Sequence, residues 1–144
     1  MERLLVIQEH HSKGAAGLHW DLRLEAEGDI SPYIIKRNET NEPKESGNSK
    51  VLKSFAIPKA RLPEIGEILL AVPTEDHPWE YKDFEGEITG EYGRGMVKLL
   101  YSGPCELLKW DTNCIKFRYN KQLFTMFPSK KKHWFIRGCK DYVS

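Results

Sequence analysis

Residues 18–25 read LHWDLRLE, and apolar and polar residues alternate through this stretch without a break. Successive side chains of a β-strand point to opposite faces, so the alternation predicts a strand with two different faces. Four apolar residues would face a core: Leu18, Trp20, Leu22 and Leu24. Four polar residues would form a row on the other face: His19, Asp21, Arg23 and Glu25. The strand therefore supports a core on one side and presents chemical groups on the other.

Most other apolar stretches are also short, rich in β-branched and aromatic residues, and separated by Gly, Pro or polar clusters. This pattern favours strands over helices. Strands are predicted at 4–8, 18–25, 51–57, 69–72, 96–102, 106–110, 114–119, 122–127 and 132–137. So many short strands in 144 residues predict a mainly β fold, a compact antiparallel β-barrel of about eight strands. Short flanking helices are expected near 62–68 and 78–84.

Length and composition set the broad class of the protein. At 144 residues the chain suits a single domain over 1–144. Its 22 basic and 21 acidic residues give a formal charge of +1, so composition alone does not indicate nucleic-acid binding. Three cysteines without CxxC spacing favour a reduced, cytoplasmic protein over a disulfide framework or a zinc knuckle. No stretch approaches the roughly 20 apolar residues of a membrane span, so we expect no membrane segment.

Two polar segments are predicted to connect secondary-structure elements. Residues 37–50, RNETNEPKESGNSK, carry no hydrophobic side chain and many turn formers, which predicts a mobile surface loop with no part in a core. Residues 90–95, GEYGRG, lack the Lys-Ser/Thr of a phosphate-binding P-loop. We predict a tight turn between strands there.

The polar row could bind a metal ion. His19 and Asp21 would lie about 7 Å apart along one face, close enough to converge on one ion while Arg23 reaches an anion beside it. A hairpin through SKGAAG would add His10 from the preceding strand. Two imidazoles and a carboxylate leave coordination positions open, which suits a catalytic metal, with Mn²⁺ favoured over Mg²⁺ and Zn²⁺ or Co²⁺ as alternatives. The competing interpretation is an amphipathic strand with a solvated polar face.

The blocks VIQEH, LHWDLRLE, LKSFAIPK, TEDHPWEYKDFEG and GEYGRGMV occur in this order, followed by HWFIR. Together they resemble the 3′-phosphoesterase domain of bacterial DNA ligase D, in its free-standing archaeal or bacterial form. The resemblance implies a manganese-binding β-barrel that acts in DNA repair by non-homologous end joining. It would remove a 3′-terminal ribonucleoside as a phosphodiesterase and then the remaining 3′-phosphate as a phosphomonoesterase. DNA or RNA 3′ ends, above all primer-template ends with a ribonucleotide, would be its substrates, and a ligase and a polymerase could act in trans.

The resemblance also assigns residues. It implies metal ligation by His10, His19 and Asp21, and phosphate contacts by Arg23 and His77. Supporting active-site positions fall on Lys59, Glu75 and Tyr81. His77 would contact the transition state or protonate the leaving oxygen. Read without the resemblance, TEDHPWEYKDFEG is a loop whose residues stabilise a turn or serve a site.

Two departures from the family pattern leave questions open. More residues separate His10 from His19 than in the family, so His11 competes with His10 as the ligand. Leu69 stands where the family has an arginine. Arg61 or one of Lys130–Lys132 would have to replace that arginine, or the phosphomonoesterase activity would be weaker. Either water or the neighbouring 2′-hydroxyl could attack the phosphorus.

Two other functions compete with this one. One is a non-catalytic nucleic-acid end-binding barrel that grips strand ends with Trp20, Trp79, Tyr81 and nearby lysines. The other is a small metal-dependent hydrolase that acts on free nucleotides or another phosphoester.

Overall fold

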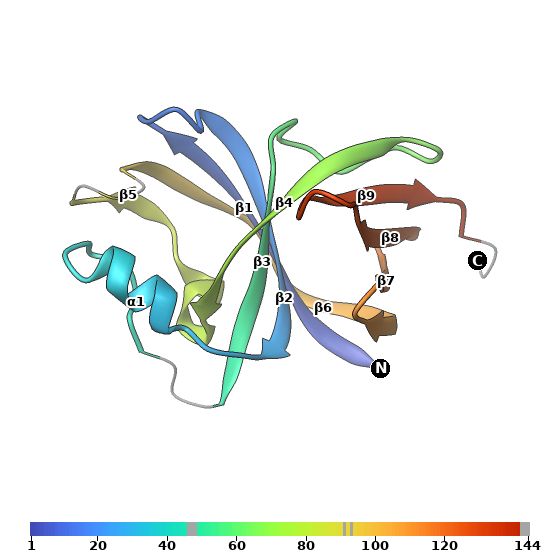
Figure 1. The fold of residues 1–144 in the computed structure, drawn as a ribbon, viewed down its shortest axis with the longest axis horizontal. Coiled ribbons are helices and arrows are strands. Elements are labelled where there is room, and N and C mark those ends of the chain that lie inside the picture. The colour runs from blue at the N-terminus through green and yellow to red at the C-terminus, as the bar shows by residue number, and fades with distance from the viewer. Residues whose placement is uncertain (46–48, 91, 93, 142–144) are drawn as a thin grey trace.

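The computed structural model describes residues 1–45, 49–90, 92 and 94–141 (Figure 1). In this part of the chain one α-helix and a 3-10 helix, η1, accompany the strands. The elements are β1 (Glu2–Ser12), β2 (Leu18–Glu27), α1 (Ser31–Arg37), β3 (Lys50–Ile57), β4 (Ile68–Pro78), η1 (Trp79–Asp83), β5 (Gly86–Ile88), β6 (Gly95–Asp111), β7 (Cys114–Tyr119), β8 (Gln122–Pro128) and β9 (Trp134–Cys139). No helix among the described residues has the length and apolar character that crossing a membrane requires.

Eight strands close into an antiparallel barrel. Neighbouring strands follow the order β1-β2-β3-β4-β9-β8-β7-β6, and β1 pairs with β6 to complete the circuit. The short strand β5 adds to the free edge of β6 near its start. The predicted mainly β, eight-stranded antiparallel barrel with short flanking helices is confirmed.

Alternate side chains of β1 and β2 fill the barrel. Leu5, Ile7, Leu22 and Leu24 are at most 3% exposed and pack in one cluster with buried residues of the other barrel strands. Trp20 is partly buried against the same cluster, as its predicted face requires. Leu18 was predicted to face this core but is 48% exposed, because it lies at the hairpin end of β2, beyond the packed centre.

A second apolar cluster covers the outer face of β1 and β3. Val6 and Leu52 pack there against Tyr33 of α1 and Tyr81 of η1. Figure 1 shows α1 and η1 on one side of the molecule, away from β7, β8 and β9. Both faces of β1 are therefore buried in its central part, one inside the barrel and one under the helices.

The helix predicted near 62–68 is wrong. Backbone groups of this segment pair with β9 at two points: Gly66 donates to the Gly138 carbonyl at 2.8 Å, and Gly138 donates to the Glu67 carbonyl at 3.0 Å. Within the segment, the Glu67 N–H donates to the Glu64 carbonyl at 2.9 Å, which makes a turn but no helix. The segment therefore makes a single turn against β9 before β4 begins at Ile68. The second predicted helix, near 78–84, is found as η1.

Two strand boundaries also differ. The strands predicted at 96–102 and 106–110 form one continuous strand, β6. Pro104 is tolerated because this part of β6 pairs with β1 alone, so the missing N–H can face an unpaired edge. The strand predicted at 69–72 extends through Pro78 in β4, so Glu75 and His77 lie on a strand and not on a loop.

The segment at 37–50 is not the surface loop that its polarity predicts. Arg37, Thr40 and Glu42 are buried, with 9%, 8% and 3% exposure. Polar contacts replace apolar ones: the Tyr33 hydroxyl donates to the Pro43 carbonyl at 2.6 Å, and the Asn41 side chain bonds the backbone around β5. Residues 46–48 of the predicted loop lie outside the described residues, as do 91 and 93 of the predicted turn at 90–95.

Substitution of Gly138 should show how tightly the 62–67 segment packs on β9. A Cβ at Gly138 would lie 2.2 Å from the Glu64 carbonyl oxygen, so Gly138→Ala should lower the free energy of unfolding by about 1–3 kcal/mol. At Gly14 a Cβ would meet only Ser12 Oγ, at 3.5 Å, so Gly14→Ala should change it by less than about 0.5 kcal/mol. Urea denaturation measures both, and equal stabilities would refute this packing.

Candidate metal and phosphate site

The register of β1 against β2 brings the polar row together. His10 lies directly opposite His19, and Gln8 lies directly opposite Asp21. Directly opposed side chains on one face start about 5 Å apart. The long hairpin therefore makes neighbours of residues that the sequence separates, as its glycine-containing connection predicts.

His10, His19 and Asp21 form a cluster with metal-ligand geometry. One ligand atom from each lies within 4.8 Å of the other two. His19 Nε2 is 3.3 Å from Asp21 Oδ2, and His10 Nδ1 is 4.0 Å from the same oxygen. Because the Gly17 carbonyl, 3.2 Å from His19 Nδ1, only accepts, Nδ1 carries a proton. Nε2, on the side of Asp21, is therefore the nitrogen that would coordinate a metal ion once it has lost its own proton. Two imidazoles and one carboxylate in this arrangement fit a divalent transition metal.

His11 points away from this cluster. Its Nε2 lies 2.8 Å from Glu9 Oε1, and its side chain is 55% exposed. Glu9 also accepts a hydrogen bond from Trp20 Nε1, at 3.0 Å. His11 and Glu9 therefore belong to the opposite face of β1, and of the two adjacent histidines it is His10 that joins the cluster.

Arg23 lies next to the cluster and is 3% exposed. Its Nε donates to Gln8 Oε1 at 2.7 Å, and its Nη2 lies 3.6 Å from Asp21 Oδ2. Its guanidinium lies over the ring of Tyr81, 4.7 Å from the centroid. Within the part of the chain that the structure describes, Arg23 Nη1 is buried without a hydrogen-bond partner. A buried donor of this kind needs an acceptor, and an anion supplies one.

His77 is almost fully buried and lies between two tyrosines. Its ring centroid is 4.8 Å from those of Tyr33 and Tyr81. Its Nδ1 lies 2.8 Å from the Glu75 carbonyl oxygen, so Nδ1 carries the proton and Nε2 does not. Burial, together with the charges of Arg23 and Arg37, lowers the pKa of His77 well below its ordinary value. His77 is therefore neutral near pH 7.

Charges around the cluster set the ionisation of its members. Burial raises the pKa of Asp21, but the charge of Arg23 and the hydrogen bond from His19 outweigh burial, and the net pKa is lowered. Burial lowers the pKa of His19, but Asp21 outweighs it, and the net pKa is raised. Asp21 is thus held as a carboxylate, the form that binds a cation.

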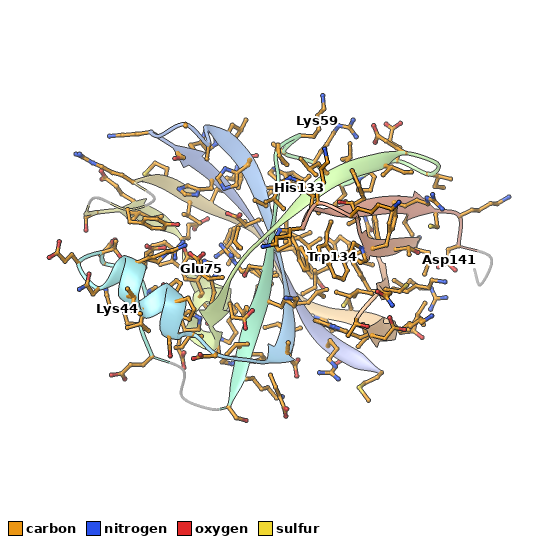
Figure 2. All side chains as sticks on the ribbon, in the orientation of Figure 1. Lys44, Lys59, Glu75, His133, Trp134 and Asp141 are labelled. Carbon is orange, nitrogen blue, oxygen red and sulfur yellow. The ribbon has the colours of Figure 1, made fainter. Side chains whose placement is uncertain are left out.

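One pocket of about 460 Å³ joins these groups. It is lined by the metal cluster, Arg23, Glu75, His77 and Tyr81. Lys59 does not line it: this residue is exposed on the turn after β3, and Figure 2 places it at the top of the view, far from Glu75, which lies beside α1. The turn still borders the pocket through Pro58.

The proposed substitutes for the family arginine also lie outside the pocket. Leu69 packs into the barrel core, at 6% exposure. Arg61 is held on the surface by Glu67 through two hydrogen bonds, of 2.5 Å and 2.7 Å. Lys130–Lys132 are exposed on the turn after β8. A cation that no motif nominated, Arg37, lines the pocket instead.

Sequence reasoning assigned no role to Gln8 and missed Arg37 and Glu42. Gln8 orients Arg23 and donates to the Tyr81 and Phe84 carbonyls, at 3.0 Å and 2.9 Å; its position on the face of His10 was the available signal. Arg37 and Glu42 come from the segment taken for a loop. The available signal for α1 was weak: Ser31-Pro32 can start a helix, and Ile30, Tyr33 and Ile34 have helical spacing.

Removal of one cluster ligand should weaken metal binding. We expect His19→Ala to lower the affinity for Mn²⁺ at least tenfold, since a site with three protein ligands loses one. His11→Ala is the matched control, because it removes an adjacent imidazole that points to the other face. Calorimetric Mn²⁺ titration measures both affinities. Equal affinity in the two variants would exclude this cluster as the metal site.

The ion pair between Glu75 and Arg37 should make the free energy of unfolding depend on pH in the acid range. Burial raises the pKa of Glu75, but Arg37 outweighs it and holds the net pKa below its ordinary value of 4.5. The resulting stabilisation is present above about pH 4.5 and is lost as the pH falls through the lower folded pKa. Glu75→Gln should therefore cost about 1–2 kcal/mol at pH 7, and the difference from wild type should shrink below pH 4.5. Urea denaturation across pH measures this, with the exposed Glu39→Gln as control; a difference that does not depend on pH would contradict the assignment.

Comparison with known proteins gives one consistent result. A family model described as the DNA Ligase D 3′-phosphoesterase domain matches residues 47–137, which include His77 and Tyr81 and begin after the metal cluster. The chain is 44% identical over 107 residues to the multifunctional non-homologous end joining protein LigD of Mycolicibacterium smegmatis, covering 73% of this chain and 11% of that protein.

The corresponding DNA repair protein LigD of Mycobacterium tuberculosis is 39% identical over 107 residues, again 73% of this chain and 11% of the relative. LigD of Pseudomonas aeruginosa is 37% identical over 92 residues, which are 63% of this chain and 8% of the relative. The chain thus spans about a tenth of the length of these relatives. With the family model matching more than half of its residues, the chain belongs to the DNA ligase D 3′-phosphoesterase domain family.

Proposed function

We propose that the protein is a metal-dependent phosphoesterase that processes 3′ ends of nucleic acids in DNA repair. It would remove a 3′-terminal ribonucleoside by phosphodiester cleavage and then the remaining 3′-phosphate. Family membership supports the reaction class. The observation that carries the proposal is the placement of an unpaired buried guanidinium N–H of Arg23 beside a three-residue metal cluster, in one pocket.

Arg23 is the group that would bind the phosphate. Its Nε and Nη2 are already engaged by Gln8 and Asp21, which fixes the guanidinium plane, and its Nη1 is left to meet a non-bridging oxygen. Because these contacts exist before substrate arrives, the charge need not reorganise as negative charge grows on the phosphoryl oxygens. Arginine suits this role through its planar, permanently charged fork.

His10, His19 and Asp21 would hold the metal ion. A cation bound there would neutralise part of the charge on a phosphoryl oxygen. We favour Mn²⁺ as the ion, because imidazole nitrogens are poor partners for Mg²⁺, and Zn²⁺ and Co²⁺ are accepted by the same donors.

His77 would act first as a proton acceptor. Its lowered pKa and its protonated Nδ1 leave an unprotonated Nε2 in the free protein. That nitrogen can accept a proton from an attacking hydroxyl or water and can then return it to the leaving oxygen. Protonation of the leaving oxygen by His77 therefore follows an earlier proton uptake.

The other predicted residues would support the site from its walls. Tyr81 lies against both Arg23 and His77, and Glu75 fixes His77 through its backbone carbonyl. Lys59 would contact the nucleic-acid strand outside the pocket, on the exposed turn after β3. A DNA ligase and a polymerase acting in trans would use the 3′ end that the reaction leaves.

A primer-template whose primer ends in one ribonucleotide tests the proposal. With Mn²⁺ we expect loss of the terminal ribonucleoside and then of the 3′-phosphate, and neither without the metal. His19→Ala should lower both rates at least a hundredfold, while His11→Ala keeps them.

Denaturing gels resolve the products. A second primer that ends in two ribonucleotides carries a 2′-hydroxyl beside the scissile phosphate, and a cyclic phosphate product from it would identify that hydroxyl as the attacking group. A mobility shift without shortening would instead indicate an end-binding module. Hydrolysis of free nucleotides alone would indicate the third function considered above.

A further inference from the structure

The residues from Ser31 to Glu45, here called the α1 segment, form one wall of the pocket. Two of its charged side chains, Arg37 and Glu42, line the pocket together with Arg23 and His77. Both are buried, with 9% and 3% exposure. Buried charges are costly unless they are paired, so their presence calls for a reason.

Glu42 makes a direct contact with a residue of the site. Its Oε2 accepts a hydrogen bond of 2.6 Å from the Tyr81 hydroxyl. The Tyr81 ring packs at its face under the Arg23 guanidinium, at 4.7 Å, and edge-on against His77, at 4.8 Å between centroids. With its hydroxyl held by Glu42, the ring cannot turn without breaking a buried bond to a charged group.

Arg37 supplies a positive charge next to the buried Glu42 carboxylate. Its Nε lies 3.3 Å from Glu42 Oε1, and its Nη1 is paired with Glu75. Its guanidinium lies 4.6 Å from the ring centroids of both Tyr33 and Tyr92. One guanidinium thus serves the two carboxylates of this wall, one that contacts Tyr81 and one whose backbone carbonyl holds His77.

We propose that Glu42 is a positioning residue, which acts through the Tyr81 hydroxyl to hold the Tyr81 ring against Arg23 and His77. The inference rests on the phosphoesterase function proposed above. Among the described side chains, Glu42 contacts Tyr81 and Arg37 through its carboxylate. Its effect on phosphate binding and turnover is therefore transmitted through Tyr81.

The α1 segment has enough other anchors to survive loss of the Glu42 carboxylate. Tyr33 donates to the Pro43 carbonyl at 2.6 Å. The Asn41 amide donates to the Glu87 carbonyl and accepts from the Thr89 N–H, both at 2.8 Å. A Glu42 variant should therefore fold with the segment in place, which makes substitution a usable test.

The experiment compares Glu42→Ala, Glu42→Gln, Tyr81→Phe and the Glu42→Ala/Tyr81→Phe double variant, with the exposed Glu39→Ala as control. Turnover of the ribonucleotide-ended primer and calorimetric binding of inorganic phosphate to the Mn²⁺-loaded protein are measured for each. Thermal unfolding and Mn²⁺ affinity are recorded alongside. We expect Glu42→Ala to lower kcat/KM and phosphate affinity about tenfold, with Mn²⁺ affinity unchanged.

Three results would support a positioning role. Glu42→Gln, which keeps an acceptor oxygen, should retain most of the activity, and Glu39→Ala should behave as wild type. The double variant should lose no more activity than either single variant. Losses that multiply in the double variant, or a Glu42→Ala protein with unchanged turnover and phosphate affinity, would overturn it. If wild type binds phosphate but leaves every strand end intact, the proposed function fails, and phosphate affinity alone then decides the role of Glu42.

Discussion

The antiparallel pairing of β1 with β2 carries both the fold and the site. Strand geometry sends Leu22 and Leu24 into the barrel, and the same geometry sends Asp21 and Arg23 to the outer face. A shift of the register by one residue would exchange the two sets and destroy both. Each metal-ligand candidate is thus held by a strand whose reverse face is locked in a packed core, which positions a side chain more accurately than a loop does.

Charges of opposite sign alternate along the wall of the pocket. Asp21 lies beside Arg23 at one end, and Glu75, Arg37 and Glu42 follow one another at the other. Tyr81 and His77 separate the two groups, and both aromatic rings are buried and uncharged near neutral pH. The arrangement keeps each buried charge near a partner and leaves an N–H of Arg23 for an incoming anion.

Much of the fold follows from strand periodicity, and so does the part of the site that lies on strands. His19, Asp21 and Arg23 were predicted to share a face from alternation along one strand, and His10 was added through the hairpin, while the family resemblance selected these residues as site residues. The extent of β6 was missed because Gly103-Pro104 normally ends a strand, and only the lack of a second partner there allows it to continue. Arg37 and Glu42 were missed for a different reason. Glu42 is held by Tyr81 and Arg37 by Glu75, and contacts between distant polar residues leave no periodic trace in a sequence.

The closing contact of the barrel joins its first strand to a strand in the last third of the chain, with Glu2 opposite Glu106. Contacts between distant segments form slowly, because the intervening chain must give up its freedom first. A chain emerging from the ribosome therefore holds His10, His19 and Asp21 early but cannot seat β1 between both of its neighbours until β6 has been made. Metal captured before that moment would meet a hairpin still open on one edge, so the binding site is held on both sides only after β6 has been synthesised.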